Sequence, residues 1–153
     1  MREIFFVILF AIGLGLYWPA VQAGFVSDDW HWLYLASQQD TIWPSLLTNY
    51  EGLRNGGSYN PIVSLWFNMW YSVFGISSAA YHTLAIVVHS LNSVLVGIVT
   101  AKISHLLFSF SRRKQRLASI YAGLLFLMYP GFVEAVAWSA AIPHVLATFF
   151  FLI

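Results

Sequence analysis

Four stretches of this chain carry no Asp, Glu, Lys or Arg: residues 4–27, 55–101, 117–133 and 135–153. A helix of roughly 20 apolar residues crosses the hydrocarbon core of a bilayer, so runs of this length are typical of membrane spans. Only 8% of all residues are charged, against about 25% in soluble domains. This composition excludes a soluble globular domain, a disordered chain and a nucleic-acid-binding protein. We therefore expect an all-α, polytopic membrane protein.

Turn residues divide these runs into about four transmembrane helices. A Gly-Ser break at residues 74–78 and the Pro130-Gly131 pair interrupt them, because Gly and Pro disfavour helix continuation. The predicted spans, all within one membrane domain of residues 1–153, are 4–22, 81–108, 117–130 and 135–153. A helix over residues 61–74 is too short to cross, and we expect it in the interface, within an outer loop of residues 23–78. Its Trp66, Trp70 and Tyr71 suit the headgroup zone.

Basic residues set the expected direction of insertion. Four of the seven Lys and Arg residues fall at positions 112–116, Lys102 lies nearby, and Arg2 precedes the first span. The positive-inside rule then places the N-terminus and the 109–116 loop in the cytoplasm. We expect a multi-pass protein of a bacterial inner membrane or an equivalent one. In the alternative, residues 2–23 are a cleaved signal peptide, although Glu3 weakens its basic start.

The chain stops within an apolar stretch, so we expect it to be the N-terminal portion of a longer membrane protein or a truncated reading frame. It contains no cysteine, which excludes disulfides and Cys-ligated metals.

The strongest candidate for chemistry is the Asp28-Asp29 pair, which directly follows the first predicted span. One carboxylate can act as a general base on an acceptor hydroxyl, while its neighbour orients the acceptor or binds a divalent cation. In the alternative, the pair begins a solvated loop, and Ser27 or Asp28 caps a short helix over residues 29–37. Glu134 is expected on the same side of the membrane, as a second acid of the site or as a helix cap.

The sequence also contains candidates for binding a metal ion or a substrate. Asp29 and Glu134 are the candidate ligands of a divalent cation, and Arg54 is the one basic residue of the outer segment. Trp30 and Tyr59 are candidates for stacking on a sugar. Polar residues on the second long span, namely His82, His89 and Asn92, share one helical face. Hydrogen bonding between helices is the favoured role for these three, over metal binding.

Three stretches together resemble a known family. Residues 25–30 resemble its Asp-Glu or Asp-Asp motif in the first outer loop. Residues 59–68, with Phe74-Gly75 and Tyr81-His82, resemble its Tyr-Arg-Pro-Leu…Phe-Gly…Tyr-His stretch, with Asn60 in place of Arg. Residues 133–138 are similar to its Glu-Ala-Val-Ala-Trp. The family comprises polyprenyl-phosphate-sugar-dependent glycosyltransferases of the C-type membrane fold, including protein O-mannosyltransferases and those that carry tetratricopeptide repeats.

The resemblance covers the N-terminal part of that fold and implies specific roles. Asp28 would be the catalytic base, with Asp29 beside it, and Glu134 would match an acid near the second outer loop. His144 stands where relatives often carry Asp. The implied activity moves a sugar from a lipid-linked phosphate donor to an acceptor hydroxyl at the outer face. The rival hypothesis is a non-catalytic membrane subunit or a transporter fragment, with Asp28 and Glu134 as structural caps.

Overall fold

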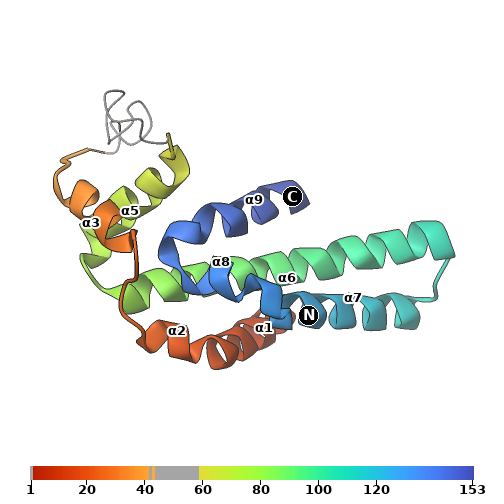
Figure 1. The fold of residues 1–153 in the computed structure, drawn as a ribbon. Coiled ribbons are helices and arrows are strands. Elements are labelled where there is room, and N and C mark those ends of the chain that lie inside the picture. The colour runs from red at the N-terminus through yellow and green to blue at the C-terminus, as the bar shows by residue number, and fades with distance from the viewer. Residues whose placement is uncertain (1, 42, 44–58) are drawn as a thin grey trace.

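The computed structural model describes residues 2–41, 43 and 59–153, and every regular element in these ranges is a helix (Figure 1). A long helix, α6 (Ser78–Phe108), folds back through a short loop onto α7 (Arg112–Met128). Helices from both ends of the chain pack along α6, while the two short helices that precede it pack against each other beside its first turns. In chain order the helices are α1 (Arg2–Leu16), α2 (Trp18–Gln22), α3 (Asp29–Ser37), α5 (Pro61–Phe74), α6 (Ser78–Phe108), α7 (Arg112–Met128), the 3₁₀ turn η1 (Pro130–Phe132), α8 (Val133–Ala137), the 3₁₀ turn η2 (Ser139–Ala141) and α9 (Ile142–Leu152).

Among the residues that the structure describes, one helix is long and apolar enough by itself to cross a membrane. This helix, α6, has 31 residues and is therefore about 46 Å long. Within the described ranges, the segment from α7 to α8 also passes if the two parts, bent by 49°, count as one span. Shorter apolar helices cover Val7–Leu16 and Ser139–Leu152. The structure thus supports one or two spans, and the set of four remains a prediction.

The predicted continuous helix over residues 135–153 is wrong. The chain leaves helical geometry at Trp138, passes through η2 and begins α9 at Ile142. Pro143 explains the restart, because proline lacks a backbone N–H and is tolerated only in the first turn of a helix. The first predicted span, 4–22, is likewise divided into α1 and α2 at Tyr17, two residues before Pro19.

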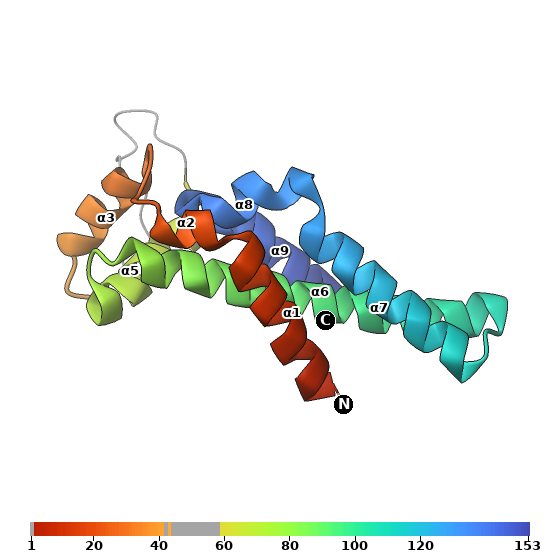
Figure 2. The same ribbon diagram turned by 90° about the horizontal axis from the view of Figure 1, so that it is seen from below.

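Small residues allow the α6–α7 hairpin to pack closely. A Cβ added at Gly97 would lie 2.9 Å from the carbonyl oxygen of Ser119, and one at Gly123 would lie 2.9 Å from that of Ser93. Such contacts between small residues are the usual way in which helices associate in lipid. Figure 2 shows α1 crossing this hairpin obliquely, beside both of its helices.

Side chains from two other segments form hydrogen bonds with a carbonyl group in the last turn of α7. The carbonyl oxygen of Leu127 lies 3.4 Å from the Tyr17 hydroxyl, which donates to it, and 3.4 Å from Nε2 of His89. Because α7 ends at Met128, its last carbonyl groups lack helical partners. In an apolar surrounding, such groups need another donor, and here the donors tie α7 to the α1–α2 break and to α6.

The predicted short helix over residues 61–74 is confirmed, since α5 has the same bounds. Its seat in the interface, with Trp66, Trp70 and Tyr71 at the headgroup zone, remains a prediction. The Trp66 ring is buried within the protein, in the cluster that joins α3, α5 and α6. Trp70 and Tyr71, by contrast, are only partly buried.

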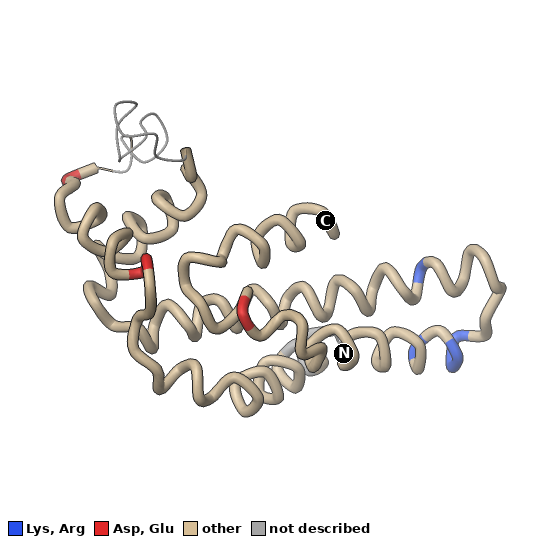
Figure 3. The backbone as a smooth tube through the Cα atoms, viewed as in Figure 1, with Lys and Arg blue, Asp and Glu red and all other residues tan. Residues whose placement is uncertain are grey.

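Charged residues separate along the molecule. Figure 3 shows the Lys and Arg residues of α6 and α7 gathered at the loop between these helices, whereas the Asp and Glu residues lie away from it. The start of α3, with Asp28 and Asp29, lies at the opposite end of α6 (Figures 1 and 3). The direction of insertion itself remains a prediction from the basic residues.

Candidate functional site at the start of α3

Phe25 anchors the segment that carries the acidic pair. Its ring is buried and meets Tyr81 of α6 edge-on, with 5.3 Å between the ring centroids. Phe67 of α5 stacks on Tyr81, also at 5.3 Å. The Ser78 hydroxyl donates to the Ala23 carbonyl over 3.0 Å. These contacts fix residues 23–25 against α5 and α6, and thereby determine where the acidic pair emerges.

A tight turn follows Phe25. Ser27 has a φ of +50°, in the left-handed region that non-glycine residues rarely adopt. The backbone N–H of Asp29 donates to the Val26 carbonyl over 3.1 Å, and the Val26 N–H donates back to Oδ2 of Asp29, also over 3.1 Å. The Trp30 indole N–H donates to the Phe25 carbonyl over 3.1 Å. This reciprocal set holds Ser27 in its strained conformation.

Asp29 is fully buried, with 0% of its surface exposed. Its Oδ2 accepts the Val26 N–H, and its Oδ1 accepts the Ala140 N–H from η2 over 2.8 Å. Burial raises the pKa of the Asp29 carboxyl, and the neighbouring charge of Asp28 acts in the same direction, while the backbone N–H groups oppose the shift. The side chain therefore joins the first outer segment to the break between α8 and α9.

Asp28 has a different environment, although it is the next residue. Its side chain is exposed. It occupies the N-cap position of α3, yet within the described part of the chain it makes no capping hydrogen bond. The structure thus gives no support to the capping alternative, and it separates the pair into a buried carboxylate and one that solvent and ligands can reach.

Glu134 lies in the first turn of α8, where it is exposed and makes no capping bond to any described residue. It lines a hollow of about 320 Å³ together with Trp138 and His144. The lining of this hollow includes neither Asp28 nor Asp29. The structure therefore joins the start of α3 to the break between α8 and α9 through Asp29 and Ala140, but it does not join Glu134 directly to the acidic pair.

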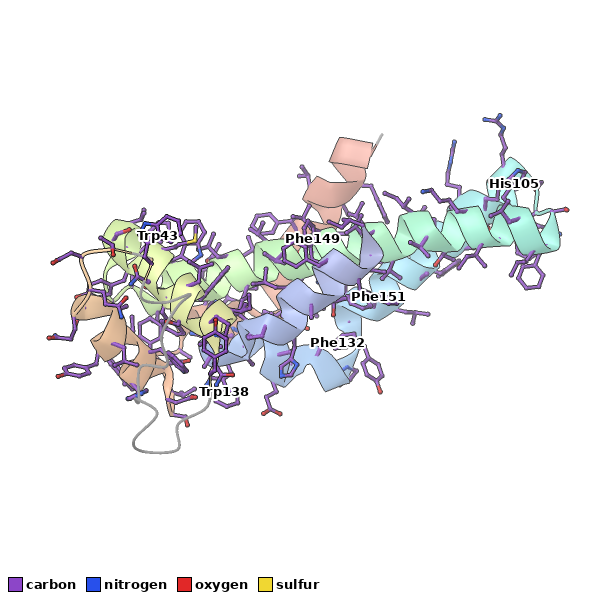
Figure 4. The ribbon with its side chains drawn as sticks, turned by 90° about the horizontal axis from the view of Figure 1, so that it is seen from above. Trp43, His105, Phe132, Trp138, Phe149 and Phe151 are labelled. Atoms are coloured by element: carbon purple, nitrogen blue, oxygen red, sulfur yellow. The ribbon has the colours of Figure 1, made fainter. Side chains whose placement is uncertain are left out.

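The indole of Trp138 adds an unusual feature to this region. Its Nε1 is buried and finds no hydrogen-bond partner among the described residues. Figure 4 shows Trp138 and Phe132 on the same side of α6, well separated along the bundle from His105 near the α6–α7 loop.

The two aromatic candidates differ in how firmly they are held. Trp30 is 55% exposed although its indole N–H is bonded, so one ring surface stays available for stacking. Tyr59 is also exposed and lies two residues before α5. Arg54 falls outside the described residues.

Metal binding receives no support from the described ranges. Within them, no group of three His, Asp or Glu side chains is arranged to hold a metal ion. Both oxygens of Asp29 already accept backbone N–H groups. A divalent cation at Asp29 and Glu134 therefore stays a prediction, and no chemical step is derived through it.

Two of the three polar residues on α6 form the expected bonds between helices. Nδ2 of Asn92 donates to the Val145 carbonyl of α9 over 2.8 Å, and His89 pairs with Leu127 as described above. His82 is buried against Phe25. Among the described groups, neither nitrogen of the His82 ring has a hydrogen-bond partner.

Sequence reasoning missed the role of Asp29 as a bridge to η2. Pro143 was the available signal, because it predicts a helix restart and hence backbone N–H groups that need acceptors. Asp29 supplies one such acceptor, but the position of Asp29 in space follows only from the folded chain.

The stretches that carry the family resemblance pack against one another. Phe25 contacts Phe67, Tyr81 and His82, and Val136 belongs to the same buried cluster. The site thus lies in an all-helical part of the chain, beside the first turns of a long apolar helix.

Comparison with known proteins gives one relevant likeness. The chain is 27% identical to the mouse protein named "Protein O-mannosyl-transferase TMTC2", over 94% of the chain and 17% of the mouse protein. It therefore spans about a sixth of the length of this relative. No protein-family model and no solved structure matches the chain. These findings indicate an O-mannosyltransferase-like relationship.

Proposed function

We propose that this chain forms the front of a membrane glycosyltransferase that moves a sugar from a polyprenyl-phosphate donor to an acceptor hydroxyl at the outer face. The observation that carries the proposal is the division of labour within the acidic pair. Asp29 is buried and fixes the turn, while Asp28 is exposed next to the ordered Trp30. The name of the mouse relative makes mannose the first sugar to test and a protein hydroxyl the first acceptor.

In the proposed reaction, the Asp28 carboxylate takes the proton of the acceptor hydroxyl as its oxygen attacks the anomeric carbon of the sugar. A bond forms between the acceptor oxygen and that carbon, and the bond from carbon to phosphate oxygen breaks. The lipid phosphate leaves with the electron pair of that bond, and the configuration of the anomeric carbon inverts. Trp30 stacks on the sugar, and Tyr59 and Glu134 are proposed to bind substrate.

The leaving phosphate needs a positive partner. Lys102 and the basic residues of α7 lie at the other end of α6 (Figure 3), so they are not suited to this task. Arg54 and cations from a part of the protein beyond this chain are the proposed sources.

The test uses the gene product as its native host makes it. Membranes carrying Asp28→Asn should lose transfer from radiolabelled polyprenyl-phosphate mannose by roughly 10²- to 10⁴-fold, the usual contribution of a general base. Asp40→Asn, which also removes an exposed acid from the outer segment, is the matched control and should keep activity. Membrane insertion is measured in parallel for both. Near-normal turnover by inserted Asp28→Asn protein contradicts the assignment, and transfer from a nucleotide sugar instead of the lipid donor contradicts the donor class.

A further inference from the structure

A groove at the basic end of the hairpin is separate from the acidic site. Its volume is about 430 Å³, within the range of roughly 300–1,000 Å³ that small-molecule sites occupy. Three helices form it: α1, α6 and α7. Its apolar lining consists of Phe5, Val94, Ile98, Ala101 and Ile120, and its polar lining consists of Lys102, Arg116 and Ser119.

The register of the hairpin places the two cations at one end of this groove. Gly97 lies against Ser119. Lys102 is five residues beyond Gly97, and Arg116 is three residues before Ser119, so both lie about 5–8 Å nearer the α6–α7 loop. Val94 and Ile120 lie on the other side of the Gly97–Ser119 contact. The groove therefore changes from apolar to basic toward the loop.

This gradient matches an amphiphile with an anionic head. The loop end is also where the basic residues predict the membrane surface, and basic pockets between helices on this side of a membrane suit anionic head groups. We propose that the groove binds an anionic phospholipid of the bilayer, with its phosphate between Lys102 and Arg116 and an acyl chain along Val94, Ile98 and Phe5. This site does not depend on the proposed catalytic activity.

The test measures which lipid the protein retains. The protein is reconstituted in nanodiscs with equal amounts of phosphatidylglycerol and phosphatidylcholine of the same acyl chains, then stripped with detergent, and the bound lipid is counted by native mass spectrometry. The protein should retain phosphatidylglycerol preferentially. Lys102→Gln with Arg116→Gln should lower this preference by roughly five-fold for each cation removed.

The matched control is Arg112→Gln with Arg113→Gln, which removes the same charge at the same end but outside the groove lining. It should keep the preference. Ala101→Phe, which fills the groove without changing charge, should lose lipid retention. Thermal unfolding in phosphatidylcholine alone verifies that each variant is folded.

Several results overturn the proposal. Equal loss in both double variants means that diffuse surface charge attracts the lipid. Equal retention of the two lipids, or of neither, means that the groove is neutral or covered by another segment of the protein. If inorganic phosphate raises the thermal stability of the protein as much as phosphatidylglycerol does, the ligand is a free anion.

Discussion

Replacing Asp29 should destabilise the folded protein, whereas replacing its neighbour Asp28 should not. Asp29→Ala leaves the N–H groups of Val26 and Ala140 without their acceptor. A buried donor left unsatisfied costs about 1–3 kcal/mol. Both bonds are only part-buried, and removing a buried carboxylate recovers some desolvation energy, so we expect a loss of about 2–4 kcal/mol in total.

The assay is thermal unfolding of the purified protein in mild detergent at neutral pH. A loss of this size lowers Tm by about 4–16 °C in a chain of this length. Asp28→Ala removes an exposed carboxylate with no capping bond in the described part of the chain and should change stability by no more than about 0.5 kcal/mol. Asp29→Asn keeps one acceptor oxygen and should fall between the two.

The comparison between the neighbours is the decisive part. If Asp28→Ala lowers Tm as much as Asp29→Ala does, the two carboxylates are equivalent and the argument for separate roles fails. Asp40→Ala, an exposed acid farther along the outer segment, gives the baseline for losing a negative charge.

Three other results are expected in the same assay. Gly123→Ala places a methyl group 2.9 Å from the Ser93 carbonyl oxygen and should cost about 1–3 kcal/mol of stability. Gly15→Ala, with no described atom within 4 Å, should instead stabilise α1 by up to about 1 kcal/mol. Equal effects of the two variants would refute the packing argument. Phe25→Ala should cost about 3–5 kcal/mol, and a loss below about 1 kcal/mol would show that Phe25 is no anchor. Burial raises the pKa of Asp29 above 3.8, so the folded chain binds this proton more tightly than the unfolded chain does. Stability should therefore decrease as pH rises from about 4 through the folded pKa. An unchanged slope of stability against pH in Asp29→Asn contradicts this.

Local features of the fold followed well from the sequence. The bounds of α5 were predicted because Pro61 begins the helix and Phe74-Gly75 ends it, both through the backbone chemistry of single residues. The long helix α6 followed from its uncharged run. The bonds of His89 and Asn92 followed from their shared face.

Features that depend on distant partners did not follow. The burial of Trp66 did not follow from its residue type, because its ring belongs to a cluster with side chains from α3, α6, α8 and α9. The sequence left open whether Glu134 joins the acidic pair or caps a helix, and it did not predict that Asp29 binds Ala140. A pattern along one helix indicates which face is polar, but it carries no information on which group from another segment will meet that face.

The hydrogen bond from Ala140 to Asp29 joins residues 111 positions apart. A ribosome adds roughly 5–20 residues per second, so the acceptor waits roughly 5–20 s for its donor to be made. Until then Oδ1 of Asp29 lacks its partner from η2. The segment that carries the acidic pair therefore reaches its final packing only after residue 140 has been made.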